Sequence, residues 1–93
     1  MSYFAVSGAP YQQKLTPTIN AANVPASSVS TQAFTIEGIV PETMYHVVAP
    51  ALEAGLFIIG ATATAVDTLT IAFFNPSVAD INPASQQFNI IGF

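Results

Sequence analysis

The sequence predicts an all-β protein, a small antiparallel β-sandwich or partial jelly roll of five or six strands with an extended N-terminal arm. In the clearest strand pattern, Leu69, Ile71 and Phe73 alternate with smaller residues, as in a strand with one face in a core. Similar short patterns recur between proline and glycine turns. Only Ala49–Ala54 has the composition of a helical turn, and no longer segment has helical spacing. These observations favour a sandwich over any helical fold.

Residues 1–28 are expected to form the extended arm, and residues 29–93 the sandwich domain. Three prolines stand among small and polar residues in the arm, a mixture that disfavours a long helix. Apolar side chains are spaced through it like anchors for a neighbouring subunit, in the manner of strand addition or arm exchange. The alternative is that the arm packs on its own domain. The candidate anchors are Tyr3, Phe4, Tyr11, Leu15 and Ile19.

Two strands are expected in the first half of the sandwich. The segment Ser30–Gly38 alternates so that Phe34 and Ile36 face a core. The segment Thr43–Ala49 lies between two prolines, and His46 falls on the face opposite to its immediate neighbours. Both strands therefore end at residues that stop strands.

A hairpin is expected next. The segment Leu56–Val66 is rich in β-branched and small residues, and Gly60 in its middle marks a bulge or a close backbone approach. It should pair with Asp67–Phe74 across a turn at the aspartate. Because adjacent strand residues face opposite ways and Phe73 continues the core face, Phe74 is a candidate interface residue.

The hairpin ends at a stop, and a last strand follows. Pro76 cannot donate to a ladder, and the side chain of Asn75 can bond nearby backbone in place of a ladder partner. The segment Gln86–Phe93 then closes the chain with apolar residues on both faces. Ile91 and Phe93 are therefore further interface candidates.

The end of the chain also carries a family resemblance. The strings Asp67–Ser77 (DTLTIAFFNPS), Ile81–Ser85 (INPAS) and Phe88–Ile91 (FNII) resemble the aspartate, alternating strand, Asn-Pro stop, small turn and closing strand of small tailed-phage virion proteins. Those proteins are capsid decoration, or cement, proteins and head-fibre β-domains. The resemblance covers about the last third of the chain, and Val66 stands where the family often has glycine or asparagine.

Composition predicts assembly. The chain has 93 residues, of which 52% are hydrophobic and 6% are charged, whereas ordinary domains carry about 25% charged residues. A lone domain of this size buries only about 60–65% of its unfolded-chain surface, so apolar patches stay exposed unless other subunits cover them. We therefore expect a homo-oligomer, with a trimer favoured.

The net charge and the length of the apolar runs exclude nucleic acid and a membrane as partners. The net charge is −4 and Lys14 is the only basic side chain, so the contacts that neutralise nucleic-acid phosphates are missing. No apolar run reaches the 18 residues of a membrane span, and the N-terminus lacks the basic start and apolar core of a signal peptide. With no cysteine, neither disulfides nor thiolate metal sites can form.

No residue pattern predicts catalysis or a cofactor. General base chemistry at His46 would need an orienting partner, and Glu42, the nearest carboxylate in sequence, stands at a strand start. Located in an interface, this histidine would make assembly sensitive to pH. The carboxylates stand singly near turns, without the spacing of a calcium loop or a glycosidase pair, although a metal shared between subunits stays open. They are Glu37, Glu42, Glu53, Asp67 and Asp80.

The resemblance implies a structural virion protein that cements a tailed-phage capsid, on the outer surface of the shell and in contact with the major capsid protein. The alternative is a head-fibre or tail-associated domain that binds a host-surface glycan. Tyr3, Tyr11 and Tyr45 would be its aromatic platforms, and tryptophan is absent. A membrane-associated peptide is a third reading, which the many prolines and turns disfavour.

Overall fold

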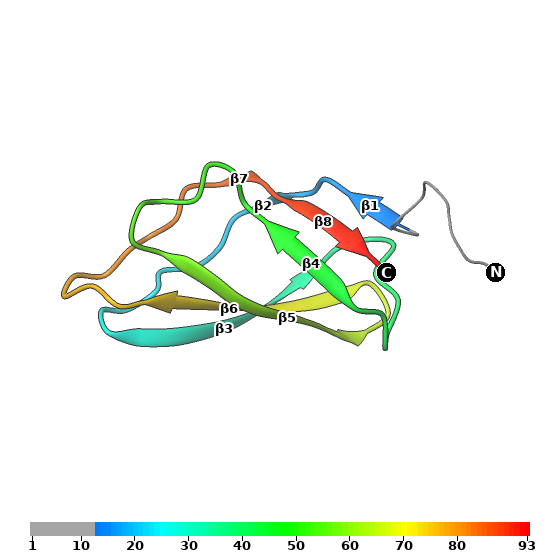
Figure 1. Ribbon diagram of the computed structural model, residues 1–93, viewed down its shortest axis with the longest axis horizontal. Coiled ribbons are helices and arrows are strands. Elements are labelled where there is room, and N and C mark those ends of the chain that lie inside the picture. The colour runs from blue at the N-terminus through cyan, green and yellow to red at the C-terminus, as the bar shows by residue number, and fades with distance from the viewer. Residues whose placement is uncertain (1–12) are drawn as a thin grey trace.

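The computed structural model describes residues 13–93 as a two-layer β protein (Figure 1). Every strand pair in this part of the chain is antiparallel, and no helix occurs in it. The all-β sandwich class expected from the sequence is therefore confirmed. The strands are β1 (Gln13–Leu15), β2 (Thr18–Ile19), β3 (Ser28–Thr35), β4 (Tyr45–Val48), β5 (Phe57–Ala65), β6 (Thr68–Asn75), β7 (Gln86–Gln87) and β8 (Asn89–Gly92).

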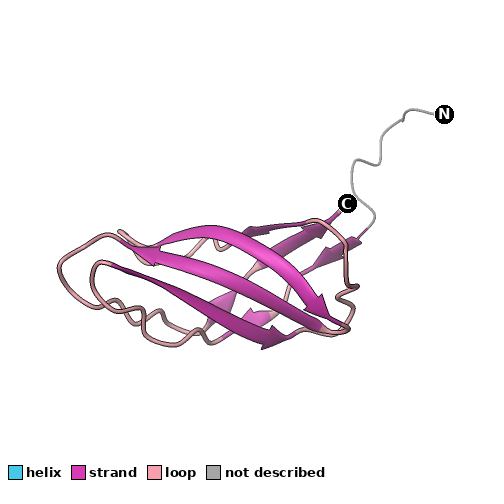
Figure 2. Ribbon diagram, turned by 90° about the horizontal axis from the view of Figure 1, so that it is seen from below, coloured by secondary structure: helices cyan, strands magenta, loops and turns pink. Residues whose placement is uncertain are grey.

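The two layers face each other across the core. One layer has the strand order β3-β6-β5, which lies nearest the viewer in Figure 2. The other has the order β1-β8-β4 and is continued by the pair β2-β7. Phe88 separates β7 from β8, and its backbone N–H donates to the oxygen of Pro17 at 2.8 Å, between β1 and β2. The last expected strand, Gln86–Phe93, is thus interrupted at one residue.

The central strand β6 supplies the core. Leu69, Ile71 and Phe73 are completely buried, as the alternating pattern predicts. The Phe73 ring lies edge-on to Phe34 of the same layer and to Phe88 of the other, with ring centroids 6.4 Å apart in both pairs. Such edge-to-face contacts add to the burial energy, so this aromatic trio joins the two layers.

The hairpin β5–β6 forms as expected, and Gly60 lies at a bulge. Ile58 pairs with Phe73 and Gly60 pairs with Ala72, which leaves Ile59 as the extra residue. The turn places Asp67 at a positive φ of 58°, a conformation that short polar side chains tolerate better than most. The sequence predicted a bulge or a close backbone approach at Gly60, because glycine weakens a regular strand.

Residue Asn75 ends β6 and is completely buried. Its Nδ2 donates to the backbone oxygens of Val24 at 3.0 Å and Ala79 at 2.8 Å. Its Oδ1 accepts from the Ser77 backbone N–H at 3.0 Å and from Ser77 Oγ at 2.7 Å. Both donors and both acceptor positions are therefore used, so this side chain replaces the ladder at the strand stop, as expected.

The described part of the expected arm, residues 13–28, packs on the same sandwich. Ile19 and Val24 belong to the buried core, and Val24 exchanges two backbone hydrogen bonds with Ile81, at 2.8 and 3.0 Å. A deletion up to Ser28 would therefore remove core residues as well as any intermolecular contact. A truncation that tests the arm alone has to end before β1.

Candidate assembly surface

The outer face of the β3-β6-β5 sheet carries no charged side chain. Strand register sets its membership, because cross-strand partners share a face. Val29 of β3 pairs with Phe74 of β6, which pairs with Phe57 of β5, and these three residues form one row across the sheet. We call this surface the neutral face. Its members are Val29, Thr31, Ala33, Thr35, Phe57, Ile59, Gly60, Thr62, Thr64, Ala65, Thr68, Thr70, Ala72 and Phe74.

Large apolar side chains gather at one end of the neutral face. Val29, Phe57 and Ile59 are 53%, 54% and 57% exposed. Phe74 lies half-buried between Val29 and Phe57. Because an aromatic side chain offers about 150–250 Å², these residues expose an apolar area on the order of 300 Å², a size that often marks a functional surface.

Small hydroxyl and methyl groups cover the rest of the neutral face. Thr64 and Thr70 share a hydrogen bond through their Oγ1 atoms at 3.2 Å, so each hydroxyl has a partner within the sheet. Burying such a surface requires no charge to be desolvated, which removes one large unfavourable contribution to association. Three strands of eight or nine residues project to about 400 Å², and side-chain relief increases the accessible area.

The carboxylates lie in the loops at the two ends of the sandwich. Asp67 accepts the Gly38 backbone N–H at 2.9 Å, and Asp80 accepts that of Ala26 at 2.9 Å. Glu53 accepts the backbone N–H of Ala84 at 2.8 Å and Nε2 of Gln86 at 3.3 Å. These three carboxylates hold loops in place. Because all five carboxylates of the chain lie outside the strands, the sheet faces carry no negative charge. No group of three or more potential metal ligands occurs within residues 13–93.

The hydrogen bond from the Ala84 backbone lowers the pKa of Glu53, and the Gln86 side chain adds to this effect. A lowered folded-state pKa contributes stability above the unfolded-state pKa, near pH 4.3, and this contribution is lost as the pH falls through the folded-state pKa. We therefore expect Glu53→Gln to unfold with a shallower dependence on pH below about 4.3. Urea unfolding at a series of pH values measures this. Glu37→Gln, at an exposed loop carboxylate, is the control, and an equal change in both variants would contradict the prediction.

The predicted interface residues do not form one surface. Phe74 lies on the neutral face, while Ile91 lies on the outer face of the other sheet, between Lys14 and His46. Phe93 is exposed, and its backbone N–H donates to the oxygen of Met44 at 3.0 Å.

The anchors predicted in the arm also separate. Leu15 is half-buried against the core, and Ile19 lies inside it. Tyr3, Phe4 and Tyr11 lie outside the described residues.

Tyr45 and His46 of β4 were considered as a glycan platform and as a general base. The Tyr45 hydroxyl donates to Gln13 Oε1 at 2.6 Å and accepts the Val40 backbone N–H at 3.0 Å, so it is engaged within the chain. His46 is exposed and forms no side-chain hydrogen bond within residues 13–93. Within residues 13–93, no helix is long and apolar enough to cross a membrane.

Comparisons of the chain with protein families, with curated proteins and with solved structures find no match. The neutral face therefore rests on geometry alone. Sequence reasoning found Phe74 from its adjacency to Phe73 but missed Val29, Phe57 and Ile59. The missing information was the strand register, since only the pairing places these residues beside Phe74.

Proposed function

We propose that this chain is a structural virion protein that decorates and stabilises a tailed-phage capsid as a homo-oligomer, with a trimer favoured. The observation that carries the proposal is the neutral face, where Val29, Phe57 and Ile59 are more than half exposed and no charge is present. Such a surface is typical of one that a protein partner covers. The proposal of a tailed-phage capsid as the partner rests on the family resemblance at residues 67–91.

The proposed mechanism is the burial of apolar surface across shell subunits. The neutral face would lie on an apolar region of the major capsid protein and bridge neighbouring subunits at the outer surface of the shell. Each 1000 Å² of apolar area removed from water contributes about 25 kcal/mol before the costs of ordering. Stabilisation of the shell would follow because subunits must lose these contacts before they separate.

The first test is the mass of the full chain in solution by light scattering, in an ionic-strength series. A closed oligomer that salt does not dissociate is expected, because apolar contacts are not screened. The second test is co-sedimentation of the chain with purified tailed-phage shells that lack decoration. Host cells replace the shells in a parallel experiment. Binding to shells and not to cells supports the proposal, whereas binding to cells alone would favour the glycan-binding alternative and overturn it.

A further inference from the structure

The two long sides of the sandwich differ in whether side-chain hydrogen bonds bridge them. On the side of β1 and β3, the Gln32 carboxamide bonds both backbone groups of Ala22, at 2.8 and 3.0 Å, and Gln13 Nε2 donates to the oxygen of Gly38. Side chains thus close this side. On the other side β4 lies next to β5, and no hydrogen bond within residues 13–93 joins the two strands.

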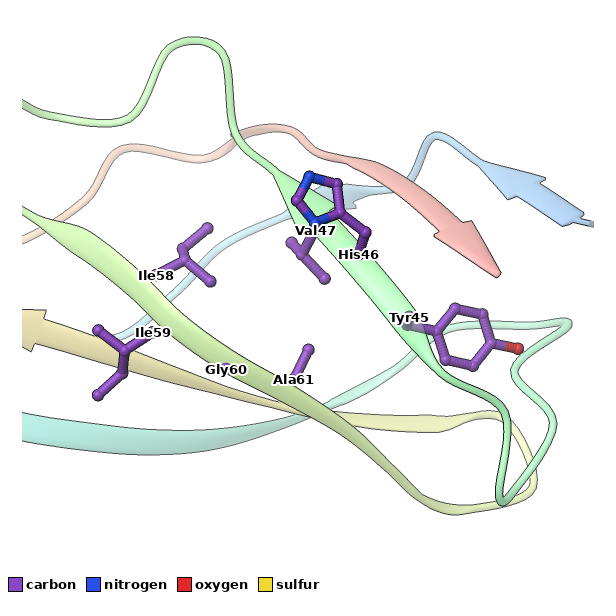
Figure 3. A pocket seen from close by; sticks show the side chains of 7 residues that line it. All are labelled: Tyr45, His46, Val47, Ile58, Ile59, Gly60 and Ala61. Atoms are coloured by element: carbon purple, nitrogen blue, oxygen red, sulfur yellow. The ribbon is translucent and has the colours of Figure 1, made fainter. Parts of the chain in front are cut away.

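A cleft of about 180 Å³ lies on this second side. Val47 of β4 and Ile58 and Ala61 of β5 point into it, and all three are half-buried (Figure 3). The exposed residues His46 and Ile59 stand at its rim. The cleft therefore has an apolar floor that continues the core.

Both strands at the cleft are edges of their sheets. β5 is nine residues long and contains neither a charge nor a proline, two of the devices that protect edge strands from pairing; the bulge at Ile59 is the protective device that it does carry. Its outward backbone groups have no partner strand in the described chain. A cleft with apolar side chains on its floor, beside free strand edges, suits an added strand, because backbone bonds supply affinity and alternate side chains fill the cleft.

We propose that this cleft binds the N-terminal segment Tyr3–Val6 of a second copy of the chain. The inference rests on the oligomer in the proposed function and assigns its contact. Residues 1–12 contain no charged side chain, and aromatic and β-branched residues favour a strand. With an alternating pattern, Phe4 and Val6 would enter the cleft together while Ala5 faces outward.

The geometry favours a second copy over the segment's own chain. β1 begins at Gln13, which pairs with Gly92, so the start of β1 lies about 10 Å, or two strand spacings, from β4. Phe93 continues the sheet beyond Gly92 by donating to Met44, and β8 with this extension lies between β1 and β4. The six residues Ser7–Gln12 span up to about 20 Å, enough to reach an adjacent copy. Such head-to-tail contacts close into rings when the rotation between copies divides a full turn, and a trimer is one such ring.

The absence of cysteine from the chain permits a direct test. Ala5→Cys and His46→Cys would be made in separate full-length chains, mixed and mildly oxidised, and the disulfide-linked peptides identified by mass spectrometry. With the segment paired to the free edge of β4, both positions would face outward on neighbouring strands. Ala5→Cys mixed with Val78→Cys is the control, because Val78 is 95% exposed in a loop. We expect on the order of tenfold more of the 5–46 link than of the 5–78 link, because docking raises the effective concentration.

Equal yields of the two links would overturn the inference, as would a 5–46 link confined to monomers in a chain that carries both cysteines. Light scattering and shell co-sedimentation of the same samples separate this outcome from failure of the proposed function. A trimer that binds shells without the 5–46 link would overturn the inference and leave the function standing. A 5–46 link between chains that bind no shell would do the reverse.

Discussion

Asn75→Ala is expected to lower the free energy of unfolding by about 2–4 kcal/mol, since it removes four hydrogen bonds that contribute about 0.5–1.5 kcal/mol each. The substitution removes every hydrogen bond of a completely buried side chain. It leaves the Ser77 backbone N–H without this acceptor, whereas the Val24 oxygen keeps the Ile81 backbone N–H and the Ala79 oxygen keeps the Ser77 hydroxyl as donors. Urea unfolding followed by circular dichroism measures the loss.

Two further variants make this prediction specific. Asn82→Ala removes an exposed asparagine from the same connection between β6 and β7, and we expect a change within about 0.5 kcal/mol. Asn75→Asp keeps the shape but loses both donors and buries a carboxyl group, so it should destabilise the fold more at neutral pH than in acid. Equal unfolding midpoints for Asn75→Ala and Asn82→Ala would contradict the role assigned to this side chain.

The features predicted correctly from the sequence are those that depend on neighbouring residues. The period of two around Leu69, Ile71 and Phe73 is a local signal, and it gave the right core face. The stop at Asn75 and the bulge at Gly60 follow from the chemistry of single residues. Strand ends were less accurate: the expected strand Thr43–Ala49 is reduced to Tyr45–Val48, because ladder partners set the ends and the sequence does not show them.

The features that the sequence did not reveal depend on distant pairing. The strands β1 and β2 have three and two residues, too few to show a period among the prolines. Val24 enters the core only because Ile81 pairs with it from the far end of the chain. The neutral face likewise combines three strands, and no single segment contains enough of it to be recognised.

The neutral face supports a second prediction, which concerns binding and not folding. Phe57→Lys should weaken binding to capsid shells on the order of 100-fold or more, because an unpaired ammonium in an apolar contact costs several kcal/mol and each 1.4 kcal/mol is tenfold in affinity. The fold should tolerate the substitution, since Phe57 is 54% exposed. A binding isotherm from co-sedimentation measures the change.

Val78→Lys is the matched control, because it adds the same charge at a residue that is 95% exposed and outside the neutral face. A non-specific electrostatic effect on shell binding would appear in both variants and would weaken with salt. Burial of residue 57 predicts instead a loss for Phe57→Lys alone, which salt does not restore because the cost is desolvation. Full shell binding by Phe57→Lys, with its unfolding midpoint unchanged, would mean that the shell contacts another surface, and the outer face of β8 around Ile91 would become the next candidate.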